Sequence, residues 1–190
     1  IEAEVKRIRE KVGIEIYSGF EARSIKELNL LVKLRRMYDI LLVRGGNLRL
    51  NRIACETPQV DILTHPELGR KDSGLDHVTM KLAVKNKVAI EINLREVTMV
   101  SKASRAKAIA NITQNIKLAK KYGARIVTCS GVTSHWELKD PLCLASFATL
   151  FGLEIKEAKE TVSKVPKEMI SLAKERRDKR WIIPGVKIVG

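Results

Sequence analysis

The sequence predicts an α/β protein of the TIM-barrel type, in which repeated βα units place parallel strands under a cover of helices. Five short apolar segments are each followed by a segment in which apolar residues recur with helical spacing. The second of them, residues 39–43, is too uniformly apolar for a sheet with one face in water. No Gly-x-Gly-x-x-Gly or Walker loop follows any of these segments, which argues against a nucleotide-binding sheet. An open doubly wound sheet is the alternative to a barrel.

The first half of the chain contains three of the expected strands. The first alternates between apolar and polar side chains and stops at a glycine. Ser24, with Glu27 three residues later, resembles a capping box and begins a helix. The second strand ends in a Gly-Gly pair that allows a tight turn, after which Asn47 caps a helix. In order, we expect a helix over residues 1–11, a strand over 12–18, a helix from Ser24, a strand over 39–43, a helix from Asn47 and a strand over 60–63.

The second half continues this alternation. Ser73 and Asp76 have capping-box spacing, so the next helix is expected to begin near Gly74. A long helix with a buried isoleucine stripe follows the fourth strand. In order, we expect a helix over residues 75–86, a strand over 88–94, a helix from Ser104 with Ile109, Ile112 and Ile116 in its stripe, a strand over 125–130, and helices up to Pro184. We assign residues 1–180 to one barrel-like domain and residues 181–190 to a C-terminal tail.

The charge of the chain points to a polyanionic partner. Lys and Arg number 36 against 22 Asp and Glu, which gives a formal net charge of +14. No apolar run approaches the roughly 20 residues that span a bilayer and no signal peptide is visible, so nucleic acid is favoured over a membrane. Aromatic residues make up only 4%, which favours contacts with backbone and shape over stacking on rings. The widely spaced Cys55, Cys129 and Cys143 are typical of reduced thiols in a cytoplasmic protein.

Basic residues gather where strands give way to loops, which is where sites lie in such folds. Arg70 and Lys71 precede a helix N-terminus, where a phosphate would be stabilised. The alternative is that Asp72 and Asp76 neutralise this pair and the loop is merely solvated. The other loops expected at this edge contain Ser18-Gly19, Arg44-Gly45-Gly46, Thr64-His65, Asn93 with Arg95, and Ser130 with His135.

A second basic feature is the stretch of residues 97–136, which contains no Asp or Glu. A solvated helical face usually mixes both signs of charge, and this one does not. We therefore expect its exposed lysines, among them Lys107, Lys117 and Lys121, to contact a polyanion.

Catalytic motifs are sparse. A metal-dependent hydrolase on this fold would gather several His, Asp and Glu ligands at the strand ends. The chain has three histidines, none close enough to another for a His-x-His pair, although Asp61, Glu91 and Cys129 could add ligands to one site. There is also no Gly-x-Ser-x-Gly elbow. We assign no catalytic residue and no metal site, and a metal-dependent phosphoesterase is the alternative function.

Five motifs carry a family resemblance. In order, they are Asp61-Ile-Leu, Arg70-Lys-Asp-x-Gly-x-Asp-His77, Asn93-Leu-Arg95, Trp136-x-x-Lys-x-Pro141 and Gly152-x-Glu. Together they resemble the ribonuclease P protein component 3 family of archaea and eukaryotes, over about residues 12–167. The resemblance implies a barrel similar to those of the polymerase and histidinol phosphatase superfamily, without that superfamily's metal ligands and with strands before residue 12 absent from this chain.

The same resemblance implies a non-catalytic subunit of the ribonucleoprotein endonuclease that removes the 5′ leader from precursor tRNA. The RNA subunit would carry out cleavage with bound magnesium, and the chain itself would bind no cofactor. The implied partners are the ribonuclease P RNA, a small ferredoxin-like protein subunit, other ribonuclease P proteins, and precursor tRNA as substrate of the complex. With its small partner, the chain would stabilise the catalytic RNA domain and lower its magnesium requirement.

The expected RNA contacts follow from the charge pattern and the resemblance together. They are Arg49, Arg52, Arg70, Lys71, His77, Arg95, Lys107, Lys117, Lys121 and Lys139. Lys139 stands where a relative has arginine, which implies a point-charge contact instead of a bidentate one. His77 is alternatively a structural histidine that holds its loop. A third hypothesis is a barrel that binds only protein, and Phe147 with Phe151 is either a partner patch or part of the core.

Overall fold

A parallel five-stranded sheet forms the centre of the computed structural model, which describes residues 2–178, 180–183 and 186–188. The strands are β1 (Gly19–Ala22), β2 (Ile40–Arg44), β3 (Ile62–Thr64), β4 (Ala89–Asn93) and β5 (Ile126–Cys129). They lie side by side in chain order, each parallel to the next. A doubly wound sheet would reverse this order, whereas a TIM barrel adds every strand on the same side. The predicted fold class is therefore confirmed.

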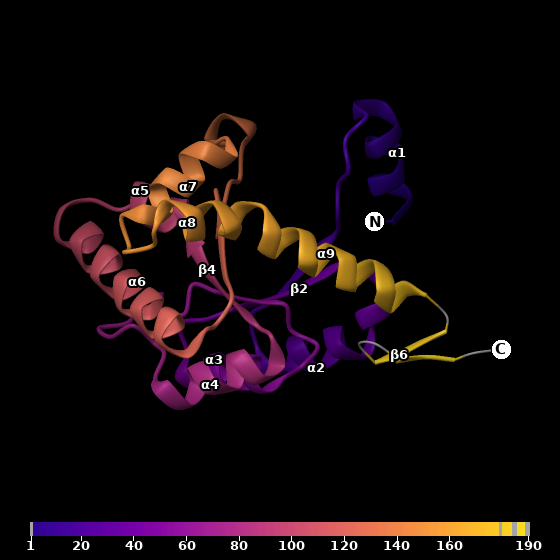
Figure 1. The fold of residues 1–190 in the computed structure, drawn as a ribbon, viewed down its shortest axis with the longest axis horizontal. Coiled ribbons are helices and arrows are strands. Elements are labelled where there is room, and N and C mark those ends of the chain that lie inside the picture. Colours follow the sequence, from indigo (N-terminus) through magenta and orange to yellow (C-terminus); the bar gives the residue numbers. More distant parts are fainter. Residues whose placement is uncertain (1, 179, 184–185, 189–190) are drawn as a thin grey trace.

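Helices follow the strands as the sequence predicts (Figure 1). They are α1 (Glu2–Val12), α2 (Ile25–Lys33), α3 (Leu48–Glu56), α4 (His77–Asn86), α5 (Leu94–Thr98), α6 (Lys102–Tyr122), α7 (Pro141–Thr149), α8 (Ile155–Val162) and α9 (Lys164–Arg177). Short 3₁₀ turns lie at Arg35–Met37 and His135–Glu137, and the strands β6 (Trp181–Ile183) and β7 (Val186–Lys187) pair antiparallel. None of these helices is long and apolar enough to cross a membrane.

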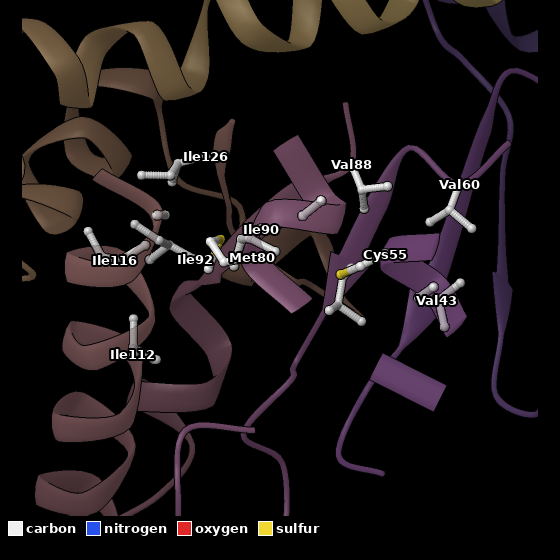
Figure 2. Packing of buried hydrophobic residues seen from close by; sticks show 14 of the residues in the cluster. Val43, Cys55, Val60, Met80, Val88, Ile90, Ile92, Ile112, Ile116 and Ile126 are labelled. Carbon is white, nitrogen blue, oxygen red and sulfur yellow. The ribbon is translucent and has the colours of Figure 1, made fainter. Parts of the chain in front are cut away.

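The main core lies between one face of the sheet and the helices that follow β1 to β4. Figure 2 shows Met80 of α4 and Ile116 of α6 gathered with Ile90 and Ile92 of β4, and all four are fully buried. Phe151 joins the same cluster and meets the Phe147 ring edge-on at 5.0 Å. These two rings are therefore packed together, with Phe151 in the core.

The opposite face of the sheet is covered by α9, which runs across it in Figure 1. Met169 of this helix packs with Ala89 of β4 and Val127 of β5 in a separate buried cluster. Strand side chains alternate between the two faces, so neighbouring residues such as Ala89 and Ile90 serve different clusters. Both faces of the sheet are thus apolar and covered, which explains the uniformly apolar strands.

Several predicted boundaries were wrong. Residues 13–18 alternate in polarity but have no neighbouring strand, and β1 is instead the segment that pairs with β2. Ser18 consequently lies at the amino end of the strands, where its N–H donates to Asp39 (2.8 Å), and not in a loop at the carboxyl edge. Helix α4 begins at His77, because Asp76 is its N-cap and accepts from the Thr79 N–H at 2.7 Å. Helix α6 begins at Lys102, earlier than predicted.

The predicted C-terminal tail is also partly structured. Residues 181–183 and 186–187 form the β6–β7 pair, and the Trp181 carbonyl accepts from Arg36 at 3.1 Å. Pro184 and Gly185, expected to mark the tail, lie outside the described residues.

Candidate nucleic-acid interface

The loop between β3 and α4, residues 65–76, is fastened to the body of the protein by two buried asparagines. The first is Asn51 of α3, which is fully buried. Its amide nitrogen donates to the carbonyl oxygens of Pro66 (2.9 Å) and Gly74 (2.8 Å). Its amide oxygen accepts from the Gly46 N–H at 3.1 Å. This one side chain therefore joins the loops that follow β2 and β3.

The second fastening comes from α6. Asn115 is buried and donates to the Ser73 carbonyl (2.8 Å) and to the Glu67 carboxylate (3.4 Å). Gly74, which follows Ser73 in the sequence, has φ +73°, and a Cβ at position 74 would lie 2.0 Å from the Pro66 carbonyl oxygen. Only glycine allows this close approach of the two arms of the loop. The loop is thus held in one shape without a ligand, which lowers the entropy cost of binding one.

Arg70 lies on this loop, and its side chain is 20% exposed. Asp72 accepts two hydrogen bonds from it, from Nε at 2.7 Å and Nη2 at 2.8 Å. Hydrogen bonding from Arg70 lowers the pKa of Asp72. The neutralisation hypothesis is confirmed for this pair, but Lys71 is exposed and forms no ion pair within the described part of the chain. A phosphate at this loop would meet Lys71 directly and would compete with Asp72 for Arg70.

Other predicted residues surround the loop on neighbouring helices. Arg49 in the first turn of α3 and His77 at the start of α4 are both exposed. The exposure of His77 argues against its role as a structural histidine. Arg52 is exposed too, and its Nε lies 2.9 Å from the Glu56 carboxylate in an ion pair. Lys107 of α6 is near enough to Asp72 to contribute to the lowered pKa of that carboxyl. Basic residues from three helices and one loop therefore share this edge.

Arg95 and Lys139 follow the carboxyl ends of β4 and β5. Arg95 forms an ion pair with Glu137, whose carboxylate also accepts from the Thr133 N–H at 3.1 Å. Lys139 is exposed, and its backbone N–H donates to Ser130 Oγ at 3.3 Å. The ion pair joins α5, which carries Arg95, to the 3₁₀ turn that precedes Lys139.

Lys117 and Lys121 do not belong to this edge. All three predicted lysines of α6 are exposed, as expected. However, a helix rises about 1.5 Å per residue, so Lys121 lies about 21 Å along the axis from Lys107. Because α6 runs from the carboxyl edge of β4 back to the amino end of β5, its last turns approach the opposite end of the sheet. The basic stretch of residues 97–136 is therefore divided between two ends of the molecule.

Beneath the loops, the carboxyl ends of the strands enclose a buried acidic cluster. His65 Nδ1 lies 3.2 Å from Glu96 Oε1, and its Nε2 lies 3.9 Å from Glu91 Oε2. The Cys129 thiol donates to Glu91. Burial raises the pKa of Glu67 to about 7, and the charges of Glu96 and Glu91 add to the rise. Neutral and charged forms of Glu67 are both accessible near physiological pH.

Within the described ranges, no three His, Cys, Asp or Glu side chains are placed so that they could hold a metal ion. Asp61, considered as a ligand, lies at the amino end of β3 and pairs there with Arg35 and Arg176. His135 is exposed and contacts the Trp136 ring at 4.5 Å. The geometry gives no support to a metal-dependent phosphoesterase.

The residues that sequence reasoning missed are the buried Asn51 and Asn115 and the half-buried Glu67, which shape the loop. Each asparagine does carry a signal, because Asn115 stands directly before Ile116 in the buried stripe of α6 and Asn51 follows the buried Leu50. A polar residue on an apolar helix face needs a hydrogen-bond partner. The sequence does not tell which loop supplies it.

Comparisons with known proteins agree on one family. A family model described as RNase P subunit p30 matches residues 2–178. Ribonuclease P protein component 3 of Methanosarcina acetivorans is 37% identical over 180 residues, covering 93% of this chain and 74% of the relative. The component from Methanocaldococcus jannaschii is 38% identical over 167 residues, covering 85% and 72%. A chain in a cryo-EM structure of archaeal ribonuclease P with mature tRNA is similar in structure, with a TM-score of 0.87 and 33% sequence identity. The match covers 100% of the present chain and 82% of the chain in the solved structure.

Proposed function

The chain belongs to the RNase P subunit p30 family, and on that premise we propose that it acts as a protein subunit of ribonuclease P, the enzyme that removes the 5′ leader from precursor tRNA. Ribonuclease P in this form is a ribonucleoprotein, and the chain takes part in tRNA processing as an RNA-binding subunit. It supplies no catalytic residue. Cleavage and the magnesium it requires belong to the RNA subunit.

The observation that carries this proposal is the fastened loop of residues 65–76, with exposed cations on it and around it. RNA phosphates repel one another when the chain folds compactly, and fixed Lys and Arg groups replace the counterions that would otherwise screen them. Because the loop is ordered by Asn51 and Asn115, contact with RNA needs no further ordering of its backbone. The protein therefore lowers the magnesium concentration at which the RNA folds and cleaves.

The partners follow from the same role. They are the ribonuclease P RNA, a small ferredoxin-like protein subunit, the other ribonuclease P proteins, and precursor tRNA as substrate of the assembled complex. The proposed contacts with RNA are Arg49, Arg52, Arg70, Lys71, His77, Arg95, Lys107 and Lys139, with Lys117 and Lys121 as a separate group. The complex works in the cytoplasm.

A reconstitution tests the proposal. The chain, its small partner, a ribonuclease P RNA and a precursor tRNA are combined, and leader removal is scored across magnesium concentrations. The wild type should shift activity to lower magnesium, and an Arg70→Ala, Lys71→Ala double variant should lose most of that shift. Arg7→Ala is the matched control, because Arg7 is exposed on α1 and pairs only within its own helix. An unchanged magnesium requirement, or phosphoester cleavage by the protein without RNA, would overturn the proposal.

A further inference from the structure

A cavity of about 570 Å³ opens at the amino ends of β2 and β3, at the opposite end of the strands from the residue 65–76 loop. Residues of α2, α9 and β6 line it, and Figure 1 shows where these elements lie. Its walls are mainly apolar. The apolar lining residues include Val32, Met37, Val60, Met169, Leu172 and Ile182. A cavity of this size accommodates a few amino-acid side chains or one small ligand.

Two hydrogen-bond donors that line this cavity have no partner. Arg176 is 8% exposed and donates from Nη2 to Asp61 at 2.7 Å, while its Nη1 is buried and makes no hydrogen bond in the described structure. Trp181 Nε1 is likewise buried without a partner there. A buried donor that gives up water without gaining an acceptor costs free energy, and a charged donor costs more. The site is therefore chemically incomplete as it stands.

An anionic acceptor suits Arg176 best, because hydrogen bonds between charged groups are stronger than neutral ones. Asp61 is shared by two buried guanidinium groups, those of Arg176 and Arg35. Arg35 is satisfied, because it also donates to the carbonyls of Gln59, Tyr38 and Asp39. Asp39, a second buried carboxylate at this end of the strands, pairs with Arg177 at 3.2 Å. Among the described residues, three guanidinium groups therefore meet two carboxylates, which leaves one positive charge in excess.

The rim of the cavity has the same sign. Lys33, Arg36, Lys85 and Lys87 are exposed around it, and Asp61 is the one acidic residue among its described lining residues. A ligand that carries both an anionic group and an aliphatic group fits an apolar cavity with a basic rim. A nucleobase fits it less well, because bases bind by stacking on rings and the lining contains a single aromatic residue, Trp181.

We propose that this cavity is a docking site for an acidic segment of a partner protein, which inserts an aliphatic side chain and presents a carboxylate to Arg176 and Trp181. This inference goes beyond the proposed RNA contacts, because it assigns one cavity at the opposite end of the sheet to a protein partner. The charge complementarity of the rim and the unpaired guanidinium nitrogen select an acidic, apolar peptide over a neutral one.

Binding of defined peptides to the full chain tests this. The probe is a fluorescein-labelled Glu-Leu-Glu-Leu-Glu peptide, compared with Gln-Leu-Gln-Leu-Gln and Glu-Ser-Glu-Ser-Glu by fluorescence anisotropy. We expect the first to bind at least tenfold more tightly than either of the others. Trp181→Phe, which removes the indole N–H together with one of the two rings, should weaken binding several-fold without unfolding the protein. Lys85→Gln with Lys87→Gln should weaken it about tenfold.

The matched control removes two charges elsewhere, as Lys156→Gln with Lys159→Gln on α8, where both lysines are exposed and neither lines the cavity. If this control loses as much affinity as the rim variant, or if the Ser peptide binds as well as the Leu peptide, attraction is non-specific and the proposal fails. In the reconstituted ribonucleoprotein, a photoreactive benzoylphenylalanine in place of Met37, which is 68% exposed at the rim, should crosslink to an Asp- or Glu-rich protein segment. Crosslinks to RNA, or none, would overturn the docking site while leaving the magnesium experiment to judge the RNA-binding role independently.

Discussion

Replacing Asn51 with alanine should loosen the RNA-facing loop and destabilise the protein at the same time. The side chain is fully buried and makes three hydrogen bonds, with Gly46, Pro66 and Gly74. Each is worth roughly 1 kcal/mol net, and the three backbone groups would be left inside the protein without a partner. The expected loss in the free energy of unfolding is therefore about 3 kcal/mol.

Asn47→Ala provides the comparison, because it removes a different bond at the start of the same helix. Asn47 is exposed and caps α3 by accepting from the Leu50 N–H at 3.1 Å. Loss of an N-cap costs about 1 kcal/mol and leaves the residue 65–76 loop attached. Urea unfolding of both variants measures the difference directly.

RNA binding supplies the second measurement. With its fastening removed, the loop must be ordered when RNA binds, so Asn51→Ala should weaken binding although it removes no charge. Asn47→Ala should bind RNA like the wild type. If Asn51→Ala is no less stable than Asn47→Ala, or if its RNA affinity is unchanged, the view that buried amides prepare this loop is refuted.

Three further predictions concern single side chains. Asp72→Asn frees the Arg70 guanidinium and removes a negative charge, so RNA affinity should rise several-fold. The slope of log affinity against log salt concentration should steepen by about 0.9. Unchanged binding would mean that Arg70 does not reach RNA. The pKa of Glu67 is raised from 4.5 to about 7, so the native state holds an extra proton between these pH values and the free energy of unfolding should fall as pH rises across that window. Glu67→Gln should remove on the order of 2–3 kcal/mol of this pH dependence, measured by urea unfolding. Identical pH profiles for the wild type and the variant would contradict the prediction. Phe151→Ala should cost about 3–5 kcal/mol by the same assay, whereas a surface patch residue would cost little.

The fold class could be predicted because it depends on patterns repeated along the chain. Buried strands covered on both faces leave an apolar run whichever neighbours they have, and Ser24 and Asn47 form the caps that local spacing predicted. The first strand was placed wrongly because alternation over residues 12–18 satisfies a strand pattern without a partner. Pairing of Gly19–Ala22 with β2 decides the real position, and that contact is not encoded locally.

The candidate site was predictable in its charges and not in its support. Exposed cations such as Lys71 and Lys107 could be predicted from the sequence, because most charged side chains lie on the surface in any fold. Whether two of them share an edge depends on helix direction, which separates Lys107 from Lys121. The hydrogen bonds of Asn51 join segments up to 23 residues apart and arise only in the folded protein. Sequence reasoning therefore found the groups that meet solvent and missed the groups that hold them in place.

The position of α9 has a consequence for synthesis on the ribosome. Arg176 reaches back 115 residues to Asp61, and Met169 covers Ala89 and Val127 on a sheet whose strands have all been translated earlier. Until residues 164–177 emerge, that sheet face is bare and apolar, and Asp61 lacks one of its two arginine partners. A nascent chain in this condition is a substrate for chaperones and for aggregation. The fold therefore cannot be completed until α9, its last long helix, has been synthesised.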